Sequence, residues 1–206
     1  MKNFHEKTRA AFPDLVKSQL EKNKRGWIKS FLEGFSQDED GNPLPWISYP
    51  AIEFLQKNLE TNHKIFEFGG GASTLFFAKR VKKVVTLETN PQWFSILQEK
   101  LAEAKIKNVE LILMEDGLTN SAYENFAKNR DEKFDFVIID SLKRFECATI
   151  STSALKPDGT ILLDDSERKN YQKIFKFFTE KKFQQSDFLG IAPGQLRIKN
   201  TTLFKI

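Results

Sequence analysis

The chain has 206 residues, which is enough for one domain with a substantial hydrophobic core. Its hydrophobic fraction of 40% and charged fraction of 29% are ordinary for a soluble globular chain. The net charge is only +4, with 32 basic and 28 acidic residues interspersed, so nucleic acid is not an expected partner. This mild positive bias tolerates an anionic substrate without requiring one.

Cysteine content and hydropathy favour a cytoplasmic location. The single cysteine, Cys147, allows neither an intramolecular disulfide nor a cysteine-based zinc site, which fits a reducing compartment. The first residues, MKNFHEKTRAAF, hold no apolar stretch of signal-peptide length. No later segment is long and apolar enough to cross a membrane. We therefore expect a cytoplasmic protein without a membrane span.

Helical patterns run through the first sixty residues. Residues 13–25 begin with a proline and precede a glycine, which predicts one helix. Apolar residues recur at helical spacing over 27–35, and a proline opens a third helical pattern over 50–59. We expect residues 1–60 to form an N-terminal helical cap on a catalytic unit at 61–206. The apolar faces of this cap leave a homodimer possible.

From residue 64 onward, short apolar strands alternate with amphipathic helices. The predicted strands are 64–68, 83–88, 109–113, 134–140 and 159–164, and the predicted helices are 72–80, 91–104, 120–130, 143–154 and 168–182. This alternation predicts a mainly parallel sheet with helices on both faces. Two further strand-like runs, 183–191 and 196–206, are joined by Ala-Pro-Gly-Gln, which is too short for a parallel crossover. The sequence therefore predicts an α/β fold with seven strands and an antiparallel C-terminal pair.

The segment KIFEFGGGASTLFFAKRVKKVVTLETN, residues 64–90, carries the most informative motif. An apolar run with Glu67 enters three glycines, 69–71, where the absence of Cβ atoms lets the chain turn sharply and a ligand touch the backbone. Glu88 follows the first glycine at about the twenty-residue spacing at which a carboxylate accepts hydrogen bonds from ribose hydroxyls. Thr74 replaces the third glycine of the dinucleotide pattern, so a pyrophosphate is less well served. The segment therefore predicts a cofactor that carries a ribose.

The residues EFGGGAS resemble the first motif of class I S-adenosylmethionine (SAM)-dependent methyltransferases, an acid-x-Gly-x-Gly-x-Ser/Thr pattern. The resemblance implies a Rossmann-like fold, SAM as the cofactor and S-adenosylhomocysteine (SAH) as its product. SAM has no phosphate, so the missing third glycine matters little. In this family the first acid orients the loop or reaches the methionine amino group, and the second acid holds the ribose. The cofactor-binding residues so implied are Glu67, Phe68, Gly69, Gly70, Gly71, Ser73, Thr74, Glu88, Thr89, Asp116, Gly117, Asp140 and Ser141.

Acidic residues follow every strand that would end at the ligand-binding edge. Ligands of such sheets bind beyond the carboxyl ends of the strands, and these ends carry Glu67, Glu88, Asp116, Asp140 and the pair 164–165. A negative rim suits a cationic sulfonium or a metal. By the resemblance, Asp116 would accept a hydrogen bond from the adenine amine, and a turn acid is the alternative.

Three of these acids are candidate catalytic residues. FDFVIID, residues 134–140, resembles the fourth family motif, whose terminal acid, here Asp140, lies near the transferable methyl group; a helix cap is the alternative. Asp164 and Asp165 end the next strand, where catechol-type O-methyltransferases carry an Asp-Asn pair that binds a divalent metal. Because this chain has Asp in the Asn position, we favour a general base or substrate anchor over metal ligands. A divalent metal stays possible.

Three further residues are candidates for contacts with the substrate. Trp46 and Tyr49 belong to the aromatic segment PLPWISYP, and they would either close over the cofactor and substrate or staple the front helices to the core. Arg144 follows Asp140 and would bind a substrate anion or lie solvated at a helix start.

The leading hypothesis is a SAM-dependent methyltransferase that acts on an oxygen of a small molecule or glycan. The motifs resemble those of bacterial methyltransferases of undetermined substrate. An N-methyltransferase of RNA or protein is an alternative, although Asp-Ser-Leu-Lys stands where base-modifying enzymes carry Asn/Asp-Pro-Pro-aromatic. An aminopropyltransferase, an NAD-dependent oxidoreductase and a non-catalytic SAM-binding protein also stay open.

Overall fold

The computed structural model describes residues 25–114 and 131–206. The helices predicted at 13–25 and 120–130, and the candidate residues Asp116 and Gly117, therefore lie outside the described residues, except for Arg25.

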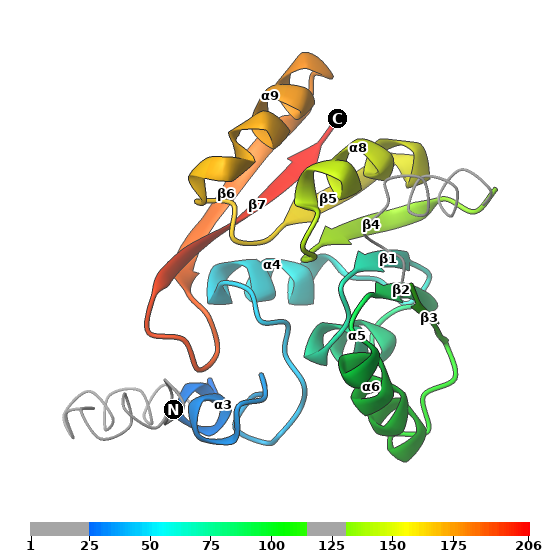
Figure 1. Ribbon diagram of the computed structural model, residues 1–206, viewed down its shortest axis with the longest axis vertical. Helices are drawn as coiled ribbons and strands as arrows, with labels where there is room; N and C mark the ends of the chain where they lie inside the picture. The colour runs from blue at the N-terminus through cyan, green and yellow to red at the C-terminus, as the bar shows by residue number, and fades with distance from the viewer. Residues whose placement is uncertain (1–24, 115–130) are drawn as a thin grey trace.

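A seven-stranded sheet with the strand order β3-β2-β1-β4-β5-β7-β6 forms the centre of the molecule (Figure 1). Its strands are β1 (Lys64–Phe68), β2 (Lys83–Glu88), β3 (Val109–Leu113), β4 (Phe134–Ile139), β5 (Leu155–Leu163), β6 (Gln184–Ile191) and β7 (Ile198–Lys205). The first five strands are parallel, whereas β7 runs antiparallel to both of its neighbours, β5 and β6. The predicted α/β fold with an antiparallel C-terminal pair is confirmed.

Helices cover both faces of this sheet. They are α3 (Trp27–Glu33), α4 (Tyr49–Asn58), α5 (Ala72–Ala78), α6 (Pro91–Glu103), α8 (Arg144–Ala154) and α9 (Gln172–Glu180), with a 3-10 turn η1 (Lys169–Tyr171) before α9. Figure 1 shows α8 and α9 on one side of the sheet and α4, α5 and α6 on the other. The helix predicted at 168–182 is shorter than expected because its first residues form η1 instead.

The fifth strand differs from its prediction at its start. It begins at Leu155 rather than at residue 159, so the Pro-Asp-Gly sequence lies inside the strand instead of before it. The register with β4 shifts at this point, because Phe134 pairs with Leu155 whereas Phe136 pairs with Thr160. A bulge of this kind accommodates a proline and a glycine in a strand.

The core has two layers because alternate residues of each strand face opposite sides. Phe66 and Phe68 pack with α8 and α9, whereas Ile65 packs with α3, α4 and α5 on the other face. In β4, Val137 and Ile139 join the first layer, and their neighbours in the strand join the second. Strands that are buried on both faces read as continuous apolar runs, which is the pattern that predicted them.

The described part of the front section packs directly on the sheet. The Trp27 indole donates to the carbonyl of Gln195 at 3.0 Å, which ties α3 to the β6–β7 hairpin. The Ser48 hydroxyl, before α4, donates to the carbonyl of Phe188 in β6 at 2.7 Å. The division of the chain at residue 60 stays a prediction. Within the two described ranges, no helix is long and apolar enough to cross a membrane.

Candidate active site

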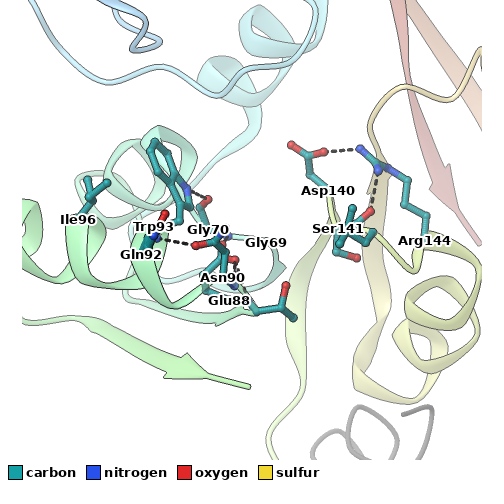
Figure 2. A pocket seen from close by; sticks show the side chains of 12 residues that line it. Gly69, Gly70, Glu88, Asn90, Gln92, Trp93, Ile96, Asp140, Ser141 and Arg144 are labelled. Atoms are coloured by element: carbon teal, nitrogen blue, oxygen red, sulfur yellow. Dashed lines mark hydrogen bonds and ion pairs between the residues drawn. The ribbon is translucent and has the colours of Figure 1, made fainter. Parts of the chain in front are cut away.

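A cavity of about 520 Å³ lies at the carboxyl edge of the sheet, where the chain leaves β1, β2 and β4 (Figure 2). Parallel strands end at the same edge, so the glycine loop, the acid after β2 and the acid after β4 meet there. The lining residues are Gly69, Gly70, Glu88, Thr89, Asn90, Gln92, Trp93, Ile96, Asp140, Ser141, Leu142 and Arg144.

The glycine loop passes close to the backbone that follows β4. Gly69 has a φ of +87°, and a Cβ atom there would lie 2.2 Å from the carbonyl oxygen of Asp140. A side chain at Gly70 would lie 2.8 Å from methyl carbons of Leu97 and Thr86. These two positions therefore require glycine because the fold leaves no space for a side chain.

Glu88 organises the acidic wall of the cavity. Its Oε2 accepts a hydrogen bond from the Gly70 amide at 2.9 Å, and its Oε1 accepts from the amides of Thr89 at 2.7 Å and Asn90 at 2.8 Å. One carboxylate thus joins the glycine loop to the start of α6. A carboxylate offers about four acceptor positions, so with three of them taken Glu88 keeps room for one hydrogen bond from a ligand hydroxyl.

Trp93 is a site residue that the sequence motifs did not reveal. It lies in the first turn of α6, and its indole donates to the carbonyl oxygen of Gly70 at 2.7 Å (Figure 2). The start of α6 is fixed by Asn90, whose side chain accepts from the Trp93 amide at 3.0 Å. Positions three or four apart share a helix face, so this predicted helix start could have indicated that Trp93 and Ile96 lie together in the cavity.

Glu67 lies beneath the glycine loop and does not line the cavity. Its side chain is fully buried, and its Oε2 accepts from the hydroxyls of Thr74 at 2.6 Å and Thr86 at 2.9 Å. Thr74 in turn accepts from the Gly71 amide at 3.1 Å, so Glu67 supports the loop through this threonine. Burial raises the pKa of Glu67 to about 7, and hydroxyl groups that bond to it oppose the rise. Its Oε1 has no hydrogen-bond partner among the described residues.

Asp140 and Arg144 form the wall opposite Glu88. The Asp140 side chain is 40% exposed, whereas that of Arg144 is only 7% exposed. Arg144 donates to Asp140 and to the carbonyl of Ser141 at 2.6 Å (Figure 2). It also donates to the hydroxyl of Tyr171 at 3.1 Å, so its position is fixed by three partners. Burial lowers the pKa of Arg144, but the negative charges around it, Asp140 first among them, raise it further, so the guanidinium stays charged.

Asp164 and Asp165 lie behind this wall and do not line the cavity. Asp164 is 1% exposed; it accepts from the Lys199 ammonium at 2.5 Å and from the Thr201 hydroxyl at 3.0 Å. Asp165 has a φ of +54° and lies 2.9 Å from the same ammonium. Burial raises the pKa of Asp164 to about 7, and nearby carboxylates add to this rise. Both side chains are thus already held by a cation, and the catalytic roles predicted for them stay predictions.

One curated protein resembles part of this chain in sequence. No protein-family model matches the chain. A probable cobalt-precorrin-6B C(15)-methyltransferase (decarboxylating) from Methanobrevibacter smithii is 31% identical over 117 residues, which cover 55% of this chain and 59% of that protein. The chain therefore matches less than two thirds of the length of this curated relative.

Solved structures resemble this fold over a larger share of the chain than the curated relative does. An O-methyltransferase from Bacillus cereus in complex with SAH has a TM-score of 0.63 at 18% identity, over 75% of this chain and 77% of that one. A precorrin-6y C5,15-methyltransferase from Geobacter metallireducens has a TM-score of 0.58 at 14% identity, over 84% and 95%. An rRNA methylase from Streptococcus thermophilus has a TM-score of 0.57 at 18% identity, over 77% and 97%.

The chain has the class I methyltransferase fold. The resemblance seen in the sequence is confirmed at this level. The neighbours that share the fold act on acceptors as different as rRNA and precorrins by their names, so the fold leaves the acceptor open.

Within the described residues, the class I fold brings about half of the candidate site residues to the cavity. Those that line it are Gly69, Gly70, Glu88, Thr89, Asp140, Ser141 and Arg144. Phe68 is buried in the core, and Gly71, Ser73 and Thr74 belong to the loop and to α5 behind it. Their predicted cofactor contacts remain untested.

The two aromatic candidates lie away from the cavity. Tyr49 is 6% exposed and its hydroxyl donates to the carbonyl of Arg25 at 3.0 Å, within the core layer of α3 and α4. The Trp46 indole donates to the carbonyl of Pro193 at 2.6 Å, in the β6–β7 connection. Their predicted role in substrate binding stays a prediction. Over residues 25–114 and 131–206, no three His, Cys, Asp or Glu side chains gather as metal ligands.

Proposed function

We propose that this chain is a SAM-dependent methyltransferase and that its cofactor binds in the cavity between the glycine loop and Asp140. The observation that carries the proposal is the arrangement around Glu88. Its carboxylate lies 2.9 Å from the Gly70 amide and faces a cavity whose volume of about 520 Å³ is within the usual range for small-molecule sites.

The residues of the cavity fit the parts of SAM. Glu88 would hold the ribose hydroxyls, and the backbone of Gly69 and Gly70, which carries no side chains, would lie against the methionine part. Ile96 and Leu142 are 41% and 83% exposed, and such apolar side chains at a cavity favour a flat heterocycle like adenine. The carboxylates of Glu88 and Asp140 would favour a cationic ligand over a dinucleotide with a pyrophosphate.

The protein's own contribution to the reaction is alignment and charge. SAM supplies an electrophilic methyl group when bound. Asp140, 40% exposed at the cavity wall, is placed to accept the proton of a hydroxyl acceptor. Arg144 holds this carboxylate in one orientation through its bonds to Asp140 and Ser141. Methyl transfer is a displacement in line with the breaking bond, so such fixed geometry lowers the barrier.

An oxygen of a small molecule or glycan is our proposed acceptor, because a hydroxyl needs the base that Asp140 offers. A carbon acceptor is the second candidate. The relative that is 31% identical is by name a C(15)-methyltransferase, and this similarity favours it. Transfer of labelled methyl from SAM to a panel of phenols, sugars and tetrapyrroles, followed by identification of the methylated atom, separates the two.

Cofactor binding is tested first, by calorimetric titration of the purified protein with SAH and, separately, with NADH. We expect SAH alone to bind. Glu88→Gln should weaken SAH binding by about 1–3 kcal/mol, roughly tenfold to a hundredfold, because it removes the charge from the acceptor of several hydrogen bonds. Glu103→Gln, an exposed acid at the end of α6, is the matched control and should bind SAH like the parent chain. NADH binding without SAH binding would overturn the proposal.

A further inference from the structure

One buried carboxylate, Asp165, has four cationic side chains around it at the end of β5. Lys199 lies 2.9 Å from its Oδ1, and Arg197 lies 2.6 Å from the same oxygen. Arg168 donates to its Oδ2, and Arg144 lies 3.6 Å from that oxygen. The Asp165 side chain is only 7% exposed, so this carboxylate fixes the positions of the cations around it.

The four cations differ in their access to solvent. The side chains of Lys199 and Arg144 are 2% and 7% exposed, whereas those of Arg168 and Arg197 are 44% and 48% exposed. A guanidinium has five N–H donors. Within the described residues, Arg168 donates to Asp165, and Arg197 to Asp165 and Glu167. Most donors of these two half-exposed guanidiniums therefore have no acceptor in the described part of the protein.

This cluster adjoins the proposed acceptor side of the cavity. Arg144 belongs to both, because it lines the cavity, bonds to Asp140 and lies 3.6 Å from Asp165. Glu88 forms the opposite wall, beside the glycine loop. The site is thus acidic where a cationic cofactor would lie and has positively charged side chains beyond Asp140.

A purely structural role explains only the buried half of the cluster. Lys199 of β7 joins Asp164 and Asp165 after β5, and this contact is enough to fasten the two strands together. Two further guanidiniums, each about half exposed, add little to that attachment, because ion pairs in contact with water contribute little to stability.

We propose that Arg168 and Arg197 bind an anionic group, a carboxylate or a phosphate, on the acceptor that enters the cavity. Both anions present two or more oxygens that match the fork of a guanidinium. Asp165 acts as the positioning residue, because its carboxylate accepts a hydrogen bond from each of these two guanidiniums. The inference rests on the proposed function for its acceptor and names the substrate class of that same site.

The test uses the full chain, labelled with ¹⁵N, with and without saturating SAH. Sodium phosphate or sodium succinate is titrated at pH 7.5 and constant ionic strength, and the Nε–Hε signals of the arginine side chains are followed by NMR. We expect the signals of Arg168 and Arg197 to shift. Arg168→Gln and Arg197→Gln should each weaken anion binding about tenfold, because each removes a charge-assisted hydrogen bond.

The matched control is Lys156→Gln. Lys156 is a cation with 41% exposure that pairs with Asp135 at 2.7 Å, but it lies at the start of β5, at the opposite edge of the sheet. Its variant loses the same charge and should bind both anions within twofold of the parent chain. Equal weakening by all three substitutions, or no saturable binding of either anion, would overturn the inference.

The choice of anion identifies the acidic group on the acceptor, and the comparison with and without SAH separates the anion site from the proposed function. Stronger binding of phosphate indicates a phosphorylated acceptor, and stronger binding of succinate indicates a carboxylated one. SAH binding without an arginine-dependent anion site would leave the proposed function standing and remove the anion site. Arginine-dependent anion binding without any affinity for SAH would leave the anion site standing and overturn the proposed function.

Discussion

Glu67 is the residue in this site whose chemistry is most altered by the fold. Its position in β1 points it away from the aromatic core layer and toward α5, where the hydroxyls of Thr74 and Thr86 donate to it. Burial raises the pKa of this carboxyl to about 7 from a usual value near 4.5. Between pH 4.5 and about pH 7, the folded protein therefore keeps a proton on Glu67 that the unfolded chain has released.

The proton linkage of Glu67 gives a testable dependence of stability on pH. For an acid whose pKa is raised in the folded state, the stabilisation is present at low pH and is lost as pH rises through about 7. Glu67→Gln removes this slope and keeps the shape of the side chain. The free energy of unfolding of the variant relative to the parent should therefore rise from pH 5 to pH 8, by on the order of 1–3 kcal/mol. Urea unfolding without added ligand measures it.

The control for this experiment is Glu103→Gln, which changes an exposed carboxylate at the end of α6. Its stability difference from the parent should stay constant between the two pH values. If the stability difference between Glu67→Gln and the parent were also the same at both pH values, burial would not have raised the pKa of Glu67.

At the scale of the element, α6 links the Glu88 side of the cavity to the sheet. Its first turn holds Trp93 against the Gly70 carbonyl, and its later residues Leu97 and Leu101 pack on α5 and β3. The helix begins at Pro91 and is capped by Asn90, whose Oδ1 accepts from the Trp93 amide. The correct start of this helix is thus a condition for the shape of the cavity.

The cap predicts a measurable loss of stability. Asn90→Ala removes the acceptor of the Trp93 amide, and we expect the free energy of unfolding to fall by about 1 kcal/mol. Asn90→Ser keeps a capping oxygen and should lose only a small part of this. Urea denaturation of the three proteins measures the difference. A loss of equal size in both variants would show that the side chain acts through something other than capping.

At the scale of the whole molecule, two aromatic and aliphatic layers hold the sheet between its helices. In the first layer, Phe178 of α9 is fully buried and stacks on Phe204 of β7, with ring centroids 4.3 Å apart. This contact joins the last helix to the last strand, and β7 in turn lies between β5 and β6. The carboxyl edge that carries Asp164 and Asp165 depends on this packing.

Truncation of Phe178 tests the contribution of this layer. Phe178→Ala leaves a cavity at a site with no exposure, and we expect a loss of about 3–5 kcal/mol in the free energy of unfolding. Phe145→Ala, at a ring with 39% exposure on α8, is the control and should cost about 1 kcal/mol or less. Unfolding midpoints in urea give both values, and similar losses would contradict the central place of α9 in the core.

Local sequence patterns were sufficient for most of the described elements and for one wall of the site. The bounds of β1, β2 and β3 are those expected. Strands β1 and β2 are almost entirely buried and are mainly apolar runs, whereas the edge strand β3 is half-buried and still mainly apolar. The glycine loop and Glu88 were found because a sharp turn and a close approach require glycine at fixed positions. The start of β5 was missed, since a strand with a bulge at Pro-Asp-Gly looks like a turn in sequence.

The sequence by itself determined the sheet, its alternation with helices and the acids that stand at the strand ends, because each depends on residues that are neighbours along the chain. The tertiary structure decided what those acids contact. Asp140 remains at the cavity, whereas Asp164 and Asp165 are drawn into ion pairs with Lys199, which follows them by more than thirty positions and reaches them only through the antiparallel pairing of β5 with β7. Burial and long-range charge pairing arise only when distant segments meet, and they are the properties that set the chemistry of this site.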